Sequence, residues 1–233
     1  SPPMDFHPEY PYDTNGGENV VWDALRSALE ADEGAVFYRY PVTDARGFVR
    51  FEPDILLHLP RRVPLILECK GCRIEHIAAV EGGTWQMSDT WHRAQEAPLN
   101  QARNQAIGLN EMLQSHGVGP THVLSLVALP FVAREEWMGT FGFQATQRNV
   151  LFAEDFDPLS LRARLHDALA LTSIDGGTSN RIAAVLGARH RIPSEPRPAD
   201  GAAATPLGAT RPISMLRYRG APLPALKQLD ESG

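Results

Sequence analysis

The stretch EPDILLHLPRRVPLILECK, residues 52–70, contains two apolar runs on either side of a three-residue segment with a proline. Two such runs around a short loop are typical of a β-hairpin. If Leu59 lies opposite Val63, counting outward along the two strands places Asp54 directly opposite Glu68. The sequence therefore predicts a hairpin with two carboxylates facing each other across it.

Opposed residues of an antiparallel pair have their Cβ atoms roughly 5 Å apart, where like charges repel. Side chains alternate between the faces of a strand, so Lys70 shares a face with Glu68 while Cys69 points to the other face. A divalent cation with oxygen ligands would offset the repulsion between Asp54 and Glu68. The hairpin is thus predicted to form half of a metal site.

Composition limits the classes of protein. The chain has 233 residues, 43% of them hydrophobic, which is enough for one domain with a sizeable core plus an appendage. Its formal net charge of −6 argues against a protein that coats nucleic acid non-specifically. Acids crowd the N-terminus and arginines gather after residue 160, however, so the net charge excludes little. No apolar run reaches the roughly 18–20 residues of a membrane span. With only two cysteines and no secretory signal, a cytoplasmic location is expected.

Lysine is rare in this chain. Its only lysines are Lys70 and Lys227, and every other basic residue except histidine is arginine. A lysine two residues after Glu68 therefore suggests that the position needs a compact amine.

The chain divides into three parts by composition. Residues 1–15, rich in proline, tyrosine and acids, are expected to form an extended N-terminal arm, with Ser1-Pro2-Pro3 as a tag remnant ahead of Met4. Residues 16–190 are expected to form the folded domain. Residues 191–233 are expected to form a linker rich in proline, alanine and glycine, and a tail that leads to a missing, helicase-like C-terminal domain.

Hydrophobic periodicity predicts an α/β fold with a central mixed sheet flanked by helices. Helices are predicted over residues 16–31, 99–116, 158–171 and 179–189. Strands are predicted over residues 35–42, 121–132 and 150–153, besides the hairpin. Residues 48–51 are expected to extend the first strand of the hairpin, and residues 73–78 to continue the sheet. The very apolar stretch 121–132 is the best candidate for a central strand.

Glu18 lies in the first turn of the first predicted helix, on the same side as Val21, Trp22 and Leu25. One interpretation is an acid favoured by the helix dipole. The other is a third carboxylate aimed at the metal, since a core-facing carboxylate needs a partner. The helix alone leaves both open.

Several short motifs occur in a consistent order. They are Gly17-Glu18, Glu52-x-Asp54, Glu68-x-Lys70-Gly71, Trp85 and Pro98-Leu99-Asn100-Gln101. In order and approximate spacing, residues 16–131 resemble the NERD (nuclease-related) domain of the PD-(D/E)XK nuclease superfamily. One departure is that NERD domains often carry Asn-Pro near the glutamine, whereas Asn100 here follows Pro98-Leu99.

The resemblance implies hydrolysis of nucleic-acid phosphodiester bonds with Mg²⁺ or Mn²⁺. Asp54 and Glu68 would hold the cation, together with the carbonyl of Cys69 and with Glu18 as a direct or water-mediated ligand. The metal would polarise the scissile phosphate and lower the pKa of a bound water.

The remaining catalytic roles fall to Lys70 and Gln101. Lys70 would position the water or stabilise developing negative charge. Gln101, on the next helix, would orient the water or a phosphate oxygen.

The same motifs permit other interpretations. Cys69-x-x-Cys72 suggests half a zinc site, but only His76 is near enough to add a ligand. A thioredoxin-like redox pair would need the motif at a helix N-terminus. The Glu68–Lys70 pair is also compatible with a charge pair on a solvated face, worth little energetically.

The resemblance also bears on partners. It implies a DNA substrate, single- or double-stranded, and leaves a homodimer open. Many NERD domains are fused to helicases, and Leu229-Asp230-Glu231 resembles the lead-in to the first motif of a UvrD-like helicase. The chain would then be the N-terminal module of such a protein. Four arginines near the junction would either contact phosphates or serve as exposed, solubilising residues, namely Arg181, Arg189, Arg191 and Arg197.

The expected function is a Mg²⁺- or Mn²⁺-dependent deoxyribonuclease that acts as a module of a larger DNA-repair or defence helicase-nuclease. The alternative is a catalytically silent module with the same fold that binds nucleic acid or docks another protein. A silent version would usually have lost Asp54, Glu68 or Lys70, and all three are present.

Overall fold

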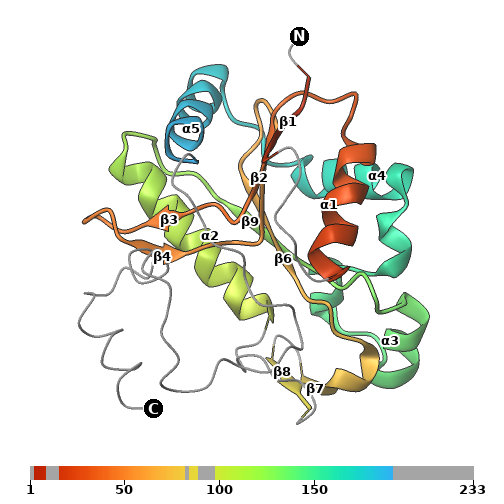
Figure 1. Cartoon of the computed structure of the whole chain (residues 1–233). Helices are drawn as coiled ribbons and strands as arrows, with labels where there is room; N and C mark the ends of the chain where they lie inside the picture. Colours follow the sequence, from red (N-terminus) through yellow and green to blue (C-terminus); the bar gives the residue numbers. More distant parts are fainter. Residues whose placement is uncertain (1–2, 9–15, 82–83, 89–97, 191–233) are drawn as a thin grey trace.

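The computed structural model describes residues 3–8, 16–81, 84–88 and 98–190. Within them, six strands form a mixed sheet in the order β1-β2-β5-β6-β9-β10 (Figure 1). The strands are β1 (Asp5–His7), β2 (Ala35–Tyr38), β5 (Ile55–His58), β6 (Leu65–Cys69), β9 (Leu124–Ala128) and β10 (Val150–Leu151). Two further pairs form separate ribbons: β3 (Val42–Thr43) with β4 (Val49–Phe51), and β7 (Ile77–Glu81) with β8 (Thr84–Met87).

Helices flank this sheet. They are α1 (Gly16–Ala28), α2 (Pro98–Ser115), α3 (Arg134–Phe141), α4 (Pro158–Leu169) and α5 (Gly176–Arg189). Three short 3₁₀ turns complete the described elements: η1 (Ile74–His76), η2 (Ala145–Asn149) and η3 (Ala153–Phe156). The expected α/β class, with a mixed sheet between helices, is confirmed. None of the described helices is both long and apolar enough to span a membrane.

The hairpin has the predicted register. β5 and β6 are antiparallel, with Ile55 opposite Leu67 and Leu57 opposite Leu65. Continuing that register by one residue places Asp54 opposite Glu68. The next strands are parallel to β6, with Glu68 opposite Val127 in β9 and Val127 opposite Val150 in β10.

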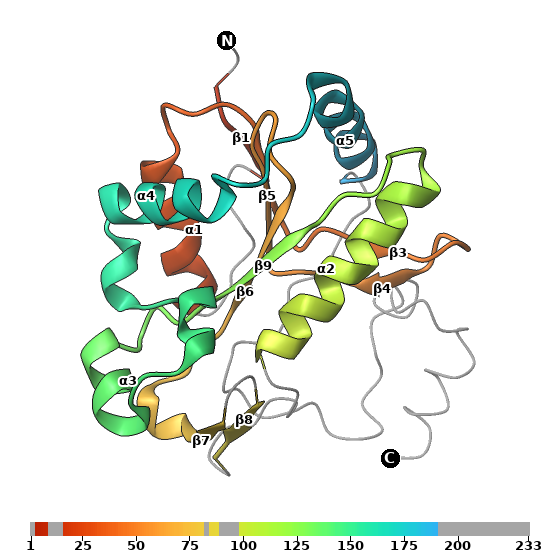
Figure 2. The ribbon, with the colours of Figure 1, turned by 180° about the vertical axis from the view of Figure 1, so that it is seen from behind.

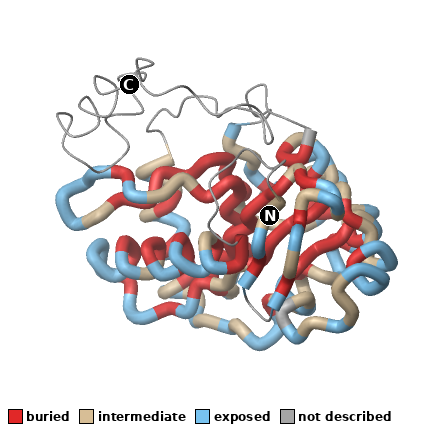
Figure 3. Tube along the Cα trace, turned by 90° about the horizontal axis from the view of Figure 1, so that it is seen from below, coloured by how far each residue is buried: buried red, intermediate tan, exposed pale blue. Residues whose placement is uncertain are grey.

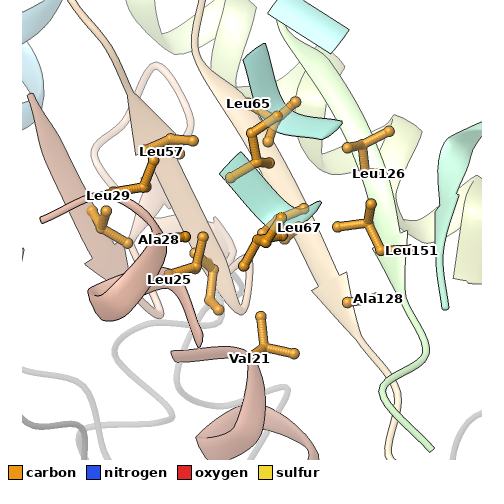
Figure 4. Packing of buried hydrophobic residues seen from close by; sticks show 14 of the residues in the cluster. Val21, Leu25, Ala28, Leu29, Leu57, Leu65, Leu67, Leu126, Ala128 and Leu151 are labelled. Atoms are coloured by element: carbon orange, nitrogen blue, oxygen red, sulfur yellow. The ribbon is translucent and has the colours of Figure 1, made fainter. Parts of the chain in front are cut away.

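One face of the sheet is covered by α1 and α4, and the other by α2 (Figures 1 and 2). On α1, Val21, Trp22 and Leu25 are spaced to lie on one side and are fully buried. Figure 4 shows Val21 and Leu25 beside the inward-pointing leucines of β5 and β6. Fully burying one such leucine stabilises the fold by about 1.5–3 kcal/mol relative to leaving it exposed.

The α2 face has its own apolar cluster, in which Leu109 and Leu113 pack with Leu56 and Ile66 of the hairpin. α2 comes close to the β3–β4 ribbon at Gly108, where a Cβ atom would lie 2.8 Å from the ring of Phe51. In Figure 3, buried residues concentrate in the sheet and on the inner sides of the helices.

Two strand predictions were wrong. Residues 48–51 do not extend the hairpin, because β4 pairs with β3 instead. Pro53 separates the two strands, and proline has no N–H for the ladder. Residues 73–78 do not continue the sheet either. The Lys70 amide still donates to the Ala128 carbonyl (3.0 Å), after which the chain turns through η1 into the β7–β8 ribbon.

The predicted helices occur with slightly different ends, whereas α3 was not predicted. Its first turn is Arg134-Glu135-Glu136, and Trp137 is its one fully buried residue, so it lacks an apolar stripe. Within the predicted extended arm, β1 pairs in parallel with β2. The predicted linker and tail, residues 191–233, lie outside the described residues.

Candidate active site

Asp54 lies just before β5 and has no exposed surface. Its Oδ2 accepts a hydrogen bond from the backbone N–H of Cys69, at 2.8 Å. This bond crosses the hairpin and fixes the carboxylate beside the last residues of β6. The side chain of Cys69 points away from the site into the apolar cluster under α1, as the strand alternation predicted.

Glu68 is also fully buried, and Lys70 is 6% exposed. The Lys70 Nζ lies 3.1 Å from Glu68 Oε1. A pair on a solvated face is therefore the wrong description of these residues. Removing two charges from water is costly, so such a pair contributes to a specific geometry more than to stability.

A second, partly buried ion pair lies beside Asp54. The Arg39 amide donates to the Asp54 carbonyl at 3.0 Å, and Arg39 Nη2 lies 3.3 Å from Glu52 Oε2. Arg39 is buried and has a φ of 51°, unusual for a residue with a side chain. Sequence reasoning missed Arg39, because only its partner Glu52 belongs to a recognisable motif.

These residues carry several formal charges on and beside neighbouring strands of the sheet. Glu52, Asp54 and Glu68 carry three negative charges, and Arg39 and Lys70 carry two positive ones, which leaves one net negative charge. Such an excess at a buried site favours binding of a cation. Carboxylate and carbonyl oxygens are also the ligands that Mg²⁺ and Mn²⁺ prefer, so the donor set fits the expected metal.

The structure brings together only part of the predicted ligand set. Asp54 and Glu68 are opposed by register, and the carbonyl of Cys69 belongs to the next residue of β6. Among the described residues, no group of three or more His, Cys, Asp or Glu side chains is arranged to hold a metal ion. The four-residue ligand set therefore stays a prediction.

Glu18 faces inward, as predicted, and is 3% exposed. Its Oε2 accepts a hydrogen bond of 2.6 Å from the hydroxyl of Tyr38. Tyr38 is opposite Ile55, the residue that follows Asp54. Glu18 is thus tied to the same end of the sheet as the hairpin carboxylates, and it also lies in the first turn of α1, where the helix dipole favours an acid.

Gln101 lies in the first turn of α2 and is half-buried. One turn further on, Gln105 is buried and, within the described part of the chain, its Oε1 has no hydrogen-bond partner. Residues four apart on a helix share a face, so both amides lie on one side of α2. Sequence reasoning missed Gln105, although its four-residue spacing from Gln101 was a usable signal.

A buried histidine lies apart from this site. His58, at the far end of β5 from Asp54, is buried, and burial lowers the pKa of its imidazole to about 4. Cys69 and Cys72 are both buried and form no disulfide, and they pack into different apolar clusters.

The comparisons with known proteins agree with this geometry at the level of the family. A family model described as the nuclease-related domain, NERD, matches residues 14–130, which is half of the chain. No match was found to a curated protein or to a solved structure. The matched range contains every residue that carries the candidate site, from Glu18 to Gln105. The chain belongs to the nuclease-related domain family.

Proposed function

We propose that this chain is a nuclease that hydrolyses DNA phosphodiester bonds with Mg²⁺ or Mn²⁺. The observation that carries the proposal is the buried arrangement of Asp54 opposite Glu68, with Lys70 3.1 Å from Glu68. Membership of the nuclease-related family supports it independently. Titratable groups held together out of water are typical of catalytic sites.

Asp54, Glu68, the carbonyl of Cys69 and, directly or through water, Glu18 would hold the cation. When bound, the cation would polarise the phosphate and lower the pKa of a water ligand. Asp54 is already held in place by the Cys69 amide, so it need not reorganise when the substrate arrives.

Lys70 has the second role. Its amine, 3.1 Å from Glu68 Oε1, can stabilise the negative charge that develops on the phosphate oxygens. Gln101 would orient the attacking water, and Gln105 offers a second amide on the same face of α2.

A catalytically silent module that binds nucleic acid or docks a partner is the second candidate. The burial of Asp54, Glu68 and Lys70 argues against it. If these charges had no function, well-packed apolar residues of similar volume would stabilise the fold at least as well. We further propose that the nuclease is one module of a larger DNA-repair or defence protein with a helicase-like motor. The support is the sequence of residues 229–231, which lie outside the described residues.

The test combines calorimetry with cleavage. The chain and its Asp54→Ala and Lys70→Ala variants are titrated with Mn²⁺ and incubated with single- and double-stranded DNA. The proposal expects Mn²⁺ binding that is lost in Asp54→Ala, and cleavage that is lost in both variants. Neither binding nor cleavage by the parent chain would overturn it, and binding without cleavage would favour the silent module.

A further inference from the structure

A cavity of about 210 Å³ lies outside the candidate active site, where α3, η2 and α4 meet. It is lined by Arg134, Phe143, Ala145, Gln147, Arg148 and Arg164. Within the described residues, this lining contains three arginines and no carboxylate. All six residues follow residue 130, so they lie beyond the part that matches the family model.

Two of the arginines are held in place by one buried carboxylate. Asp155 Oδ2 lies 2.9 Å from Arg134 Nη2, and Asp155 Oδ1 lies 3.7 Å from Arg164 Nε. Asp155 is itself fixed, because the Phe152 amide donates to its Oδ2 at 2.8 Å. Arginines that are already ordered lose little entropy when they bind an anion.

The charges around the cavity are mixed. Arg164 Nη2 donates to the carbonyl of Val150 at 3.2 Å, and both carboxylate oxygens of Glu154 accept from the Arg134 amide. Glu135 and Glu136 also follow Arg134 in the first turn of α3. What the cavity offers an anion is therefore the guanidinium groups of its lining rather than a positive net charge.

Phe143 adds an exposed aromatic ring to the lining of the cavity. Its side chain is 70% exposed, which is unusual for a phenyl ring. Guanidinium groups bind phosphate, and an exposed aromatic ring offers a surface on which a nucleobase stacks. A duplex keeps its bases stacked inside, so a phenyl ring stacks on a base without first unstacking the duplex only in a single strand.

The cavity lies beside the edge of the sheet that carries the candidate active site. Glu68 is opposite Val127, and Val127 is opposite Val150, to whose carbonyl Arg164 donates. Two strand spacings correspond to roughly 10 Å between the backbones of β6 and β10. β10 is an edge strand of the sheet, so the cavity lies beside that edge.

We propose that this cavity is a subsite for single-stranded nucleic acid. The ring of Phe143 stacks on one base, and the guanidinium groups of Arg134 and Arg148 bind the adjoining phosphates. The proposal rests on the proposed nuclease function, since it assigns a substrate class to that activity. It also makes a separate claim, because binding at this subsite does not require the metal.

The test is binding without cleavage. The full chain is mixed in EDTA with a fluorescein-labelled oligothymidine of about 12 nucleotides, and anisotropy is measured against a labelled duplex at several salt concentrations. The variants are Phe143→Ala and Arg148→Gln. The controls are Leu171→Ala, at a fully exposed apolar residue, and Arg46→Gln, at an exposed arginine elsewhere.

Phe143→Ala is expected to weaken single-strand binding by at least about fivefold and to leave duplex binding unchanged. Arg148→Gln is expected to weaken binding and to reduce the log–log salt slope by about 0.7. Control-like binding by Phe143→Ala, or an equal loss on duplex, would overturn the subsite. If the parent chain fails to cleave DNA while its variants show these losses of binding, the proposed nuclease function is contradicted and the subsite stands.

Discussion

Asp54 and Cys69 are joined across the hairpin by a hydrogen bond of 2.8 Å from the Cys69 amide to Asp54 Oδ2. A side chain thus supplies the acceptor for a backbone donor at the end of the β5–β6 pair, before the chain leaves the sheet. Asp54 consequently has a structural role besides the proposed binding of a cation. Variants at this position must separate the two roles.

Asp54→Asn keeps an oxygen that can accept from the Cys69 amide, whereas Asp54→Ala leaves a buried donor without a partner. We expect Asp54→Ala to lower the free energy of unfolding by about 1–3 kcal/mol and Asp54→Asn to lower it by less. Urea unfolding measures both. Cleavage should be lost in both variants, since neither has the charge. Equal destabilisation by the two variants would show that the hydrogen bond is unimportant.

The buried Glu68–Lys70 pair predicts strong coupling between the two positions. Lys70→Met alone leaves the Glu68 carboxylate buried beside an apolar chain, which should cost about 3–5 kcal/mol of unfolding free energy. The double variant Glu68→Gln/Lys70→Met removes both charges and should recover much of that loss. A double-mutant cycle from denaturant unfolding measures the coupling. Additive effects would mean that the two side chains do not interact.

The Arg39–Glu52 pair should tune cation binding through its charges. Arg39→Met removes a positive charge opposite Asp54 and is expected to strengthen Mn²⁺ binding by roughly threefold to tenfold. Glu52→Gln should weaken Mn²⁺ binding by a similar factor. Titration calorimetry at low salt compares the two. If both variants change the affinity in the same direction, the pair acts through structure and not through charge.

Because His58 is buried, we expect the protein to lose stability in mild acid. Burial lowers the pKa of His58 to about 4, below the value near 6.5 expected in the unfolded chain. The unfolded chain therefore binds more protons between these values, and the stability falls as the pH falls from about 6.5 to about 4. His58 is expected to lower the free energy of unfolding at pH 5 by about 2 kcal/mol relative to pH 7.

The check is urea unfolding of the parent chain and His58→Gln at both pH values. His58→Gln should lose less stability than the parent when the pH falls from 7 to 5. A pH dependence equal to that of the parent would exclude His58 as the source.

The hairpin and its register were predictable because the apolar runs around Pro60 fix which residues face each other. The burial of Glu68 and Lys70 followed from the apolar residues before them. Arg39 could not be predicted, because its position depends on an unusual backbone conformation and on a partner 13 residues away. The same holds for α3, whose one fully buried tryptophan gives no periodic signal.

The errors have related causes. Residues 48–51 have the composition of a strand, but a local pattern cannot show which strand it pairs with. Pro53 was the available sign that the hairpin ends there. The arginine cavity was also missed, since Arg134, Arg148 and Arg164 are scattered in sequence and are gathered only by the fold.

The most direct test of the central claim is Mn²⁺-dependent DNA cleavage under single-turnover conditions, by the parent chain and by Glu68→Gln/Lys70→Met. The double variant is expected to stay folded while losing the charges that the proposed chemistry needs. Arg46→Gln serves as the control. The account predicts cleavage by the parent and the control, and a loss of about 100-fold or more in the double variant. A folded double variant that cleaves DNA at the parent's rate would contradict it.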